Sequence, residues 1–274
     1  MAFLTIDQTK CKRDGICSAE CPRRIIIQEK DKSFPQFAQA DEANCMACGH
    51  CVAVCPHGAL SVTGVAIEDC PKIENDRVLS WDQTEQFLRS RRSIRCFKDK
   101  AMDRGTMEQL INTARYAPTA SNAQNLHWTV IEGRDNLETL SRETINWMER
   151  VIQAQPDSQA ADYFRPVVAG WAIGYDGILR TAQTLIIPSA PKESANGLVD
   201  LSIALSYLEL AALPLGVGTC WAGLLRGAML ATPELLESMD LPEGHTWFYP
   251  MMIGYPKFKY HRLPERKAAV IHWK

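Results

Sequence analysis

The sequence lacks the features that mark several protein classes. The first residues, MAFLTIDQTK, do not contain the apolar core of a secretory signal peptide. The longest weakly polar stretch, residues 208–225, is interrupted by Pro214 and glycines and is short for a membrane span. A formal net charge of −2 provides no general attraction to nucleic acid or anionic membranes. We therefore expect a cytoplasmic protein that binds neither nucleic acid nor membrane.

Motifs of dinucleotide binding and histidine metal sites are also missing. GVGTCW, residues 216–221, has tryptophan where the third glycine of G-x-G-x-x-G belongs, so no dedicated Rossmann domain is expected. The six histidines contain no H-x-x-H pair, and we assign none of them to a metal. No catalytic acid or base can be named. Chemistry carried by a cofactor fits that pattern.

Cysteines are present in two related runs. CKRDGICSAECP spans residues 11–22, and CMACGHCVAVCP follows 34 residues later at 45–56. The second run has the full C-x2-C-x2-C-x3-C-P spacing of iron–sulfur proteins, whereas Asp14 stands in the first run where the second has Cys48. Repetition at a fixed offset indicates two similar half-units packed against each other.

Zinc is the competing interpretation, because paired C-x2-C units also suit a tetrahedral zinc site. The C-P endings and the doubled run are not a zinc pattern. Disulfides are less favoured still, since ten cysteines in 274 residues is a modest density and the start of the chain does not indicate secretion.

The two runs resemble those of the two-cluster bacterial ferredoxins. The resemblance implies two iron–sulfur clusters with crossed ligation, one held by Cys45, Cys48, Cys51 and Cys21. The other would be held by Cys11, Cys17, Cys55 and whatever serves at position 14. As a ligand, Asp14 would be a hard oxygen donor on a soft site, giving a [4Fe-4S] cluster with one labile iron or a [3Fe-4S] cluster. As a loop residue beside Gly15, it would simply fill a turn.

Near residue 72 the sequence changes from a cysteine-rich segment to long helical patterns with few cysteines. This change predicts two domains, at 1–72 and 80–274, joined by a polar connector after Pro71. Cys70 is interpreted as a linker cysteine. Beyond the connector, amphipathic patterns predict helices at 80–95, with Ser80 as N-cap, and at 103–117. Residues 198–216 predict a central buried helix, and 127–132, 184–189 and 247–254 predict strands. Helices outnumber strands without regular alternation, so we predict an α+β fold.

Four segments in order resemble the nitroreductase family. RRSIRCF, residues 91–97, is similar to its flavin-phosphate segment, and APTASNAQNLHW, residues 117–128, to its A-P-S-x-x-N-x-Q-P-W. LGVGTCWAGLLR resembles its G-[LI]-G-[ST]-x-W-x-G loop, and IGYPKFKYHRLPER resembles its C-terminal G-Y-P segment. The departure is Asn125 and Leu126 in place of proline and tryptophan, which affects the substrate side of the site.

The resemblance implies an FMN-binding homodimer with the flavin at the subunit interface. Backbone N–H groups at Ala222 and Gly223 would face the reactive edge of the flavin. Arg91, Ser93 and Arg262 would hold the phosphate and polyol, with Arg92, Arg95 and Arg266 as further candidates. The segment that reaches the flavin from the partner subunit would contribute Pro118, Thr119, Ser121, Asn122 and Gln124.

Together these resemblances predict an FMN-dependent oxidoreductase that passes electrons between iron–sulfur clusters, FMN and a planar organic acceptor such as a nitroaromatic or quinone. The donor would be NAD(P)H or an external electron carrier. The alternative is an electron-transfer or redox-sensing module in which FMN is only a relay. We interpret Trp221 and Leu126 as core residues, and Cys96 and Cys220 as small buried fillers rather than nucleophiles.

Overall fold

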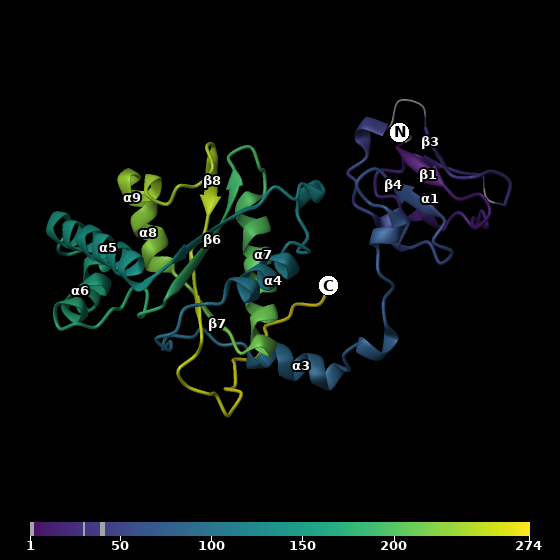
Figure 1. Cartoon of the computed structure of the whole chain (residues 1–274). Coiled ribbons are helices and arrows are strands. Elements are labelled where there is room, and N and C mark those ends of the chain that lie inside the picture. The colour runs from purple at the N-terminus through teal and green to yellow at the C-terminus, as the bar shows by residue number, and fades with distance from the viewer. Residues whose placement is uncertain (1–2, 30, 39–41) are drawn as a thin grey trace. The chain divides into compact units, whose positions relative to one another are not determined.

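The computed structural model describes residues 3–29, 31–38 and 42–274. Contacts divide the chain into two compact units (Figure 1). The first consists of Met1–Leu79 with Ser121–Ala123, and the second of Ser80–Ala120 with Gln124–Lys274. Each unit has its own hydrophobic core. They are therefore described separately.

Short elements and two small sheets make up the first unit. Strand β1 (Leu4–Ile6) pairs antiparallel with β4 (Leu60–Val62), and β2 (Ile26–Ile27) pairs antiparallel with β3 (Gln36–Phe37). The core contains Cys17, Ile26, Cys51, Leu60 and Val62, so cysteines of both runs lie inside it. The helical segments are α1 (Ile16–Glu20), α2 (His50–Ala53), η1 (Glu42–Asn44), η2 (Ile67–Asp69) and η3 (Asn75–Arg77).

Glycine opens the short helix of each half-unit. Gly15 precedes α1 with φ 80°, and Gly49 precedes α2 with φ 73°. Side chains rarely adopt this left-handed conformation, which glycine enters without steric cost. A Cβ at Gly49 would also lie 3.2 Å from Val65 Cγ1. The two glycines lie 34 residues apart, as the cysteine runs do, and the repeat in the sequence is therefore a repeat in backbone conformation.

The second unit consists of one antiparallel sheet with helices packed against it. The strands are β5 (His127–Glu132), β6 (Thr184–Pro191), β9 (Met251–Gly254) and β7 (Gly218–Trp221) in spatial order, with β8 (His245–Phe248) also paired to β6. The helical segments are α3 (Trp81–Ser90), α4 (Arg104–Ala114), α5 (Arg134–Ala154), α6 (Gln159–Ala172), α7 (Gly197–Ala212), η5 (Leu213–Leu215), α8 (Gly223–Ala231) and α9 (Pro233–Glu237). The short η4 (Ala120–Asn122) begins in this unit, and its last two residues are grouped with the first.

Strand β6 is buried on both faces. Because side chains alternate along a strand, Leu185 and Ile187 enter one hydrophobic cluster while Ile186 enters the other. The first cluster contains residues of α5, α6, α8 and α9, and the second contains residues of α4 and α7. Helices therefore cover both faces of the sheet (Figure 1). The α+β prediction is confirmed.

Helix α7 is the apolar helix expected at 198–216, but it is not buried all round. It contacts α4 and β6, whereas Val199 and Tyr207 are 56% and 43% exposed. Within the described ranges, Gly197–Leu215 is the one helical stretch long and apolar enough to cross a membrane by length and composition, and 39% of it is buried in this fold. A core helix with one uncovered apolar face accounts for both observations.

Local predictions differ in how well they match the structure. Strand β5 has the expected bounds, and Ser80 is the N-cap of α3, where its Oγ accepts from the Gln83 N–H at 3.3 Å in a capping box. The strand expected at 247–254 is broken into β8 and β9 between Phe248 and Met251. Pro250 at this break cannot donate a ladder hydrogen bond, which explains the interruption.

Candidate functional site

Four cysteines line a hollow in the first unit, which we call the four-cysteine hollow. Cys45, Cys48 and Cys51 come from the second run, and Cys21 comes from the end of the first. The rest of the lining is mainly apolar: Pro22, Ile25, Ile26, Phe37, Met46, Gly49 and Val62, together with Arg23. The set of thiols is the one that the crossed ligation pattern implies.

Three cysteines line a second hollow of the same unit, the three-cysteine hollow. Cys11 and Cys17 come from the first run and Cys55 from the end of the second, and Asp14 lies with them. This lining is more polar, because it also contains Lys12, Gln28 and His57. Each run thus lends its last cysteine to the hollow of the other run.

Deeply placed thiols in both hollows are hard to ionise. Burial, with neighbouring Cys55 and Cys11, raises the pKa of the Cys17 thiol. Burial, with neighbouring Cys48 and Cys21, raises the pKa of the Cys51 thiol to about 11. In the described ranges, no group of three or more His, Cys, Asp or Glu residues lies close enough to hold a single metal ion. Thiols that surround a hollow fit a group of several atoms, such as a cluster.

Asp14 lies in the three-cysteine hollow with both carboxylate oxygens engaged. Oδ1 accepts from the Ile16 backbone N–H at 3.2 Å, which is the contact of a loop aspartate that closes a turn. Oδ2 lies 3.5 Å from His57 Nε2, and the side chains of Asp14 and His57 are about one third exposed. Features of both interpretations of Asp14 are therefore present: it stabilises a turn and it lines the hollow.

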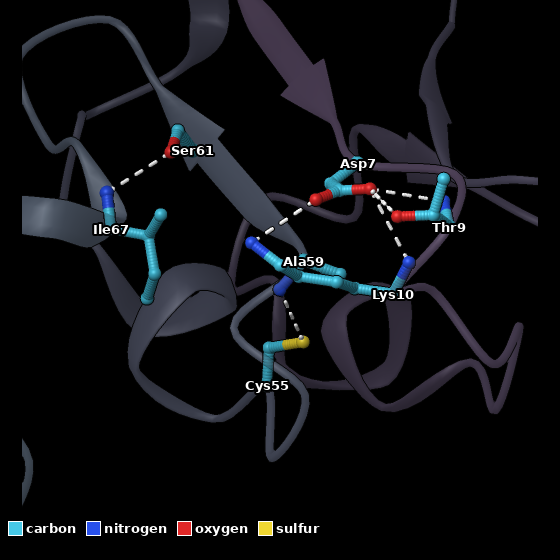
Figure 2. Close-up of polar contacts among 7 residues, drawn as sticks. All are labelled: Asp7, Thr9, Lys10, Cys55, Ala59, Ser61 and Ile67. Carbon is cyan, nitrogen blue, oxygen red and sulfur yellow. Dashed lines mark hydrogen bonds and ion pairs between the residues drawn. The ribbon is translucent and has the colours of Figure 1, made fainter.

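Hydrogen bonds fix the turns that precede Cys11 and follow Cys55, and Figure 2 shows those made by the side chains of Asp7 and Cys55. The Asp7 carboxylate accepts from the backbone and hydroxyl of Thr9 and pairs with Lys10, and these contacts lower its pKa to about 2. The Cys11 N–H then donates to the Asp7 carbonyl at 2.9 Å. On the other side, the Ala59 N–H donates to Cys55 Sγ at 3.4 Å. The turn after β1 therefore places Cys11, and the turn before β4 places Cys55.

In the second unit, the segment 91–97 lies against β7. The Ile94 N–H donates to the Thr219 carbonyl at 2.8 Å, and Phe97 bridges to Pro256. Arg91 and Arg92 line a hollow here together with residues of β7 and the C-terminal segment. We call it the arginine hollow. Its other polar lining residues are Ser90, Glu209, Thr219, Lys259 and Tyr260.

Glu209 is the functional candidate that sequence reasoning missed. Its carboxylate, 9% exposed, lies 3.6 Å from Arg91 Nη1 and accepts from the Thr219 hydroxyl at 3.4 Å. Burial raises its pKa, although the charge of Arg91 and a hydrogen bond from Trp221 act in the opposite direction. The signal was available as an ionisable residue inside the largely apolar run of α7. Its carboxylate therefore lies beside the Arg91 guanidinium in the lining of the hollow.

Residues of the expected partner-facing segment lie in an exposed, tightly turned stretch. The Ala120 N–H donates to the buried Asp200 carboxylate at 3.1 Å, and the Gln124 N–H donates to Thr119 Oγ1 at 3.0 Å. Ser121, Asn122 and Gln124 all have positive φ, between 48° and 56°. Pro118, Ser121 and Gln124 are exposed. Left-handed conformations at non-glycine residues are costly and concentrate at functional segments.

Several other residues predicted to contact the flavin do not line the arginine hollow. The Ala222 N–H, which was expected to face the reactive edge of the flavin, donates to the Pro250 carbonyl at 2.9 Å and is committed inside the fold. Gly223 begins α8, where the first N–H groups of a helix have no partner within it. Ser93 pairs with Thr219 through the backbone. Of the described residues, those that line the arginine hollow do not include Ser93, Arg95, Arg262 or Arg266.

One prediction about cysteines was wrong. Cys96 is exposed, because Ile94 and Phe97 take the inward positions of the segment. Cys220 is 6% exposed, and burial raises the pKa of its thiol, as expected of a filler. Leu126 and Trp221 pack against the hydrophobic core, as predicted. Cys70 also packs against the core of the first unit, where its Sγ donates to the Ala66 carbonyl at 3.2 Å.

The family of the second unit is established by comparison with known proteins. Residues 88–255 match the nitroreductase family, over more than half of the chain. The chain belongs to the nitroreductase family. It is therefore an oxidoreductase of the nitroreductase type, as the sequence predicted. Residues 9–60 match the 4Fe-4S dicluster domain, which confirms the iron–sulfur character of the N-terminal part.

Individual relatives agree with this assignment. An FMN reductase [NAD(P)H] of Bacillus subtilis is 27% identical over 189 residues, which cover 68% of this chain and 71% of the relative. An NADPH-dependent oxidoreductase of Staphylococcus haemolyticus is 26% identical, with 70% and 72% covered. A nitroreductase with bound FMN from Bacteroides fragilis has a TM-score of 0.55 at 22% identity, over 69% of this chain and 99% of that one, and so shares the fold.

The raised pKa of Glu209 predicts a pH-dependent stability difference between wild type and Glu209→Gln. As pH rises above the ordinary Glu value of 4.5, the unfolded chain loses this proton before the folded chain does. The wild type should therefore lose stability relative to Glu209→Gln until the raised pKa is passed. Chemical denaturation followed by tryptophan fluorescence measures this in the second unit, because all seven tryptophans lie beyond residue 80. A difference that is independent of pH would contradict it.

Proposed function

We propose that the protein is an FMN-dependent oxidoreductase that passes electrons between iron–sulfur clusters, FMN and a planar organic acceptor such as a nitroaromatic or quinone. The observation that carries the proposal is the arginine hollow of a nitroreductase-family unit in the same chain as two cysteine-lined hollows. When bound, FMN supplies two-electron chemistry and the clusters supply one-electron chemistry. The relatives named as FMN and NADPH enzymes support a nicotinamide donor.

The residues of the arginine hollow fit a flavin phosphate. Arg91 and Arg92 offer guanidinium groups, and Lys259 adds an ammonium group, a donor set that suits phosphate. Arg92 Nε is buried without a hydrogen-bond partner among the described residues. A buried donor of this kind gains most from an anionic ligand. The buried Glu209 carboxylate holds Arg91 in place from the other side.

The neighbouring backbone fits the rest of the cofactor. Strand β7 ends at Trp221, and α8 begins at Gly223, so the start of this helix follows the strand that borders the arginine hollow. The N-terminal end of a helix favours negative charge. Gly223 would thus stabilise the charge that a reduced flavin carries. The exposed turn at 118–124 would approach the flavin of a second subunit.

Assays under anaerobic conditions test the function. FMN-loaded protein is reduced by NADH, by NADPH or by a chemical reductant, and is then offered a nitroaromatic or a quinone. We expect two-electron turnover of an organic acceptor that depends on bound FMN. If reduced protein passes electrons only to one-electron carriers and to no organic acceptor, the relay alternative replaces the proposal.

Arg91→Ala and Arg89→Ala make a matched pair for this test. Arg91 lines the hollow, whereas Arg89 pairs with Glu85 and Glu265 near the end of α3. Loss of a hydrogen bond to a charged group costs about 1.5–3 kcal/mol. Arg91→Ala should therefore weaken FMN binding roughly 10- to 100-fold with iron content unchanged. Arg89→Ala should bind FMN like wild type, and equal affinities for the two variants would contradict the site.

We further propose that the protein is an obligate homodimer. Apolar side chains are exposed on α7, at Val199 and Tyr207, and in the C-terminal segment, where Ile271 and Trp273 are 62% and 86% exposed. The turn at 118–124, which we expect to reach the flavin of a neighbouring subunit, would also need a second copy of the chain. Large exposed apolar areas mark interaction surfaces, and obligate dimers often have no stable folded monomer.

A charge placed on the exposed face of α7 should therefore separate the subunits. We expect Val199→Asp to shift sedimentation at micromolar concentration toward monomer and to release FMN. Ile73→Asp, at a residue of the first unit that is 88% exposed, is the control and should leave both unchanged. An active, flavin-loaded wild-type monomer would refute the dimer.

In the three-cysteine hollow, we propose that Asp14 serves as the fourth ligand of a cluster. It stands at the repeat position of Cys48 and lines the hollow with Cys11, Cys17 and Cys55. An oxygen ligand binds iron more weakly here than sulfur does, so that iron should be the first lost under mild oxidation. The turn contact of Oδ1 does not prevent this, because a carboxylate has two oxygens.

Asp14→Cys should therefore make the labile iron resistant to oxidation and change the paramagnetic spectrum of that cluster alone. Asp14→Asn is the control: it keeps the size of the side chain and its ability to close the turn, but it is a poorer ligand, so it should lose iron more readily than wild type. The same oxidation behaviour in wild type and Asp14→Cys would show that Asp14 is only a loop residue.

A further inference from the structure

The two cysteine hollows are related by the repeat at most of their lining positions. An offset of 34 residues carries nine of the twelve residues that line the three-cysteine hollow onto residues that line the four-cysteine hollow, so that Leu60 corresponds to Ile26 and His57 to Arg23. The cysteines correspond in the same way. Three differences in polarity therefore fall at matched positions: Lys12 corresponds to Met46, Asp14 to Cys48, and Gln28 to Val62.

Gln28 is the difference that remains unexplained by the fold. It follows β2 and lines the three-cysteine hollow, and its Oε1 lies 3.9 Å from Cys17 Sγ. Its Nε2 is buried and has no hydrogen-bond partner within the part of the chain that the structure describes. A buried amide donor left unpaired costs about 1–3 kcal/mol. Val62, at the matching position, presents only methyl groups to the four-cysteine hollow.

A bound cluster would satisfy this donor. Cys17 as a ligand is a thiolate, which can only accept hydrogen bonds, and half a turn of the Gln28 amide exchanges Oε1 for Nε2. The amide would then donate to the Cys17 sulfur or to a neighbouring sulfide. Donors to cluster sulfur stabilise the reduced state, which carries more negative charge, and so raise the reduction potential.

We propose that Gln28 tunes the cluster of the three-cysteine hollow to a higher reduction potential than it would otherwise have. This rests on the proposed function, in which each hollow holds a cluster. Reduction adds one electron to the cluster; no bond is made or broken, and the amide hydrogens stay on Nε2. Gln28 is thus a positioning residue that acts through hydrogen bonding, and it makes the two clusters energetically unequal.

Reciprocal substitutions test the proposal. Gln28→Val gives the three-cysteine hollow the side chain of the other hollow, and Val62→Gln does the reverse. The full chain is reconstituted anaerobically, and both clusters are followed by EPR in a redox titration with chemical mediators. The signal that changes in Asp14→Cys identifies the three-cysteine hollow.

Gln28→Val should lower the potential of that cluster by an amount equivalent to about a tenfold change in the reduction equilibrium, near 59 mV for one electron. Val62→Gln should raise the potential of the other cluster, and each change should leave the remaining cluster unaltered. Gln28→Leu serves as a second apolar variant of closer volume if Gln28→Val does not fold.

Unchanged potentials in Gln28→Val or Gln28→Leu, with full iron content, would overturn the role of Gln28 while the two-cluster assignment stands. A wild-type chain that takes up no cluster in the three-cysteine hollow would instead overturn the proposed function, and this role with it. Iron and sulfide analysis of the wild type, made before any titration, separates the two failures.

Discussion

The fold of the N-terminal unit is constrained by its cysteines, because thiols that are distant in the sequence must lie around the same small hollow. A short loop can supply three of them only if the chain turns sharply, and Gly15 and Gly49 provide the left-handed turn at the start of α1 and α2. The fourth position has to be filled from the other half-unit. This exchange makes each hollow depend on both halves, so the unit has one shared core that includes Cys17 and Cys51.

The second unit is organised around the central strand β6. Its alternating side chains enter two hydrophobic clusters, and β5, β8 and β9 pair with it directly. The arginine hollow lies beside β7, which is last in the strand order β5-β6-β9-β7 and contacts the segment 91–97. A rigid sheet therefore holds the backbone behind Arg91, and the buried Glu209 on α7 fixes the direction of its guanidinium group.

Features written as local patterns were predictable from the sequence. The cysteine repeat, the Ser80 cap, strand β5 and the α+β class all follow from spacing or periodicity. Partnerships between distant residues were not: Glu209 looked like one of two acidic residues on a largely apolar helix, and its contact with Arg91 spans 118 positions of the sequence. Gln28 carries no motif at all, and only the comparison of two hollows distinguishes it from an ordinary loop residue.

The errors have similar causes. Cys96 was expected inside because cysteine is usually buried, but Phe97 occupies the inward position. The Ala222 N–H was expected to face the flavin, but it donates to the Pro250 carbonyl at the break between β8 and β9. Pattern reasoning identifies which groups are present. Their partners depend on tertiary packing.

Gly218 illustrates how closely the arginine segment lies against the sheet. A Cβ built at this position would lie 2.4 Å from Ile94 Cγ1 and 2.9 Å from Pro256 Cγ. Any larger residue at 218 would therefore push both the segment 91–97 and Pro256 away from β7. The space at position 218 is limited from two sides, so that even alanine there would require a smaller side chain at 94 together with a shift of Pro256.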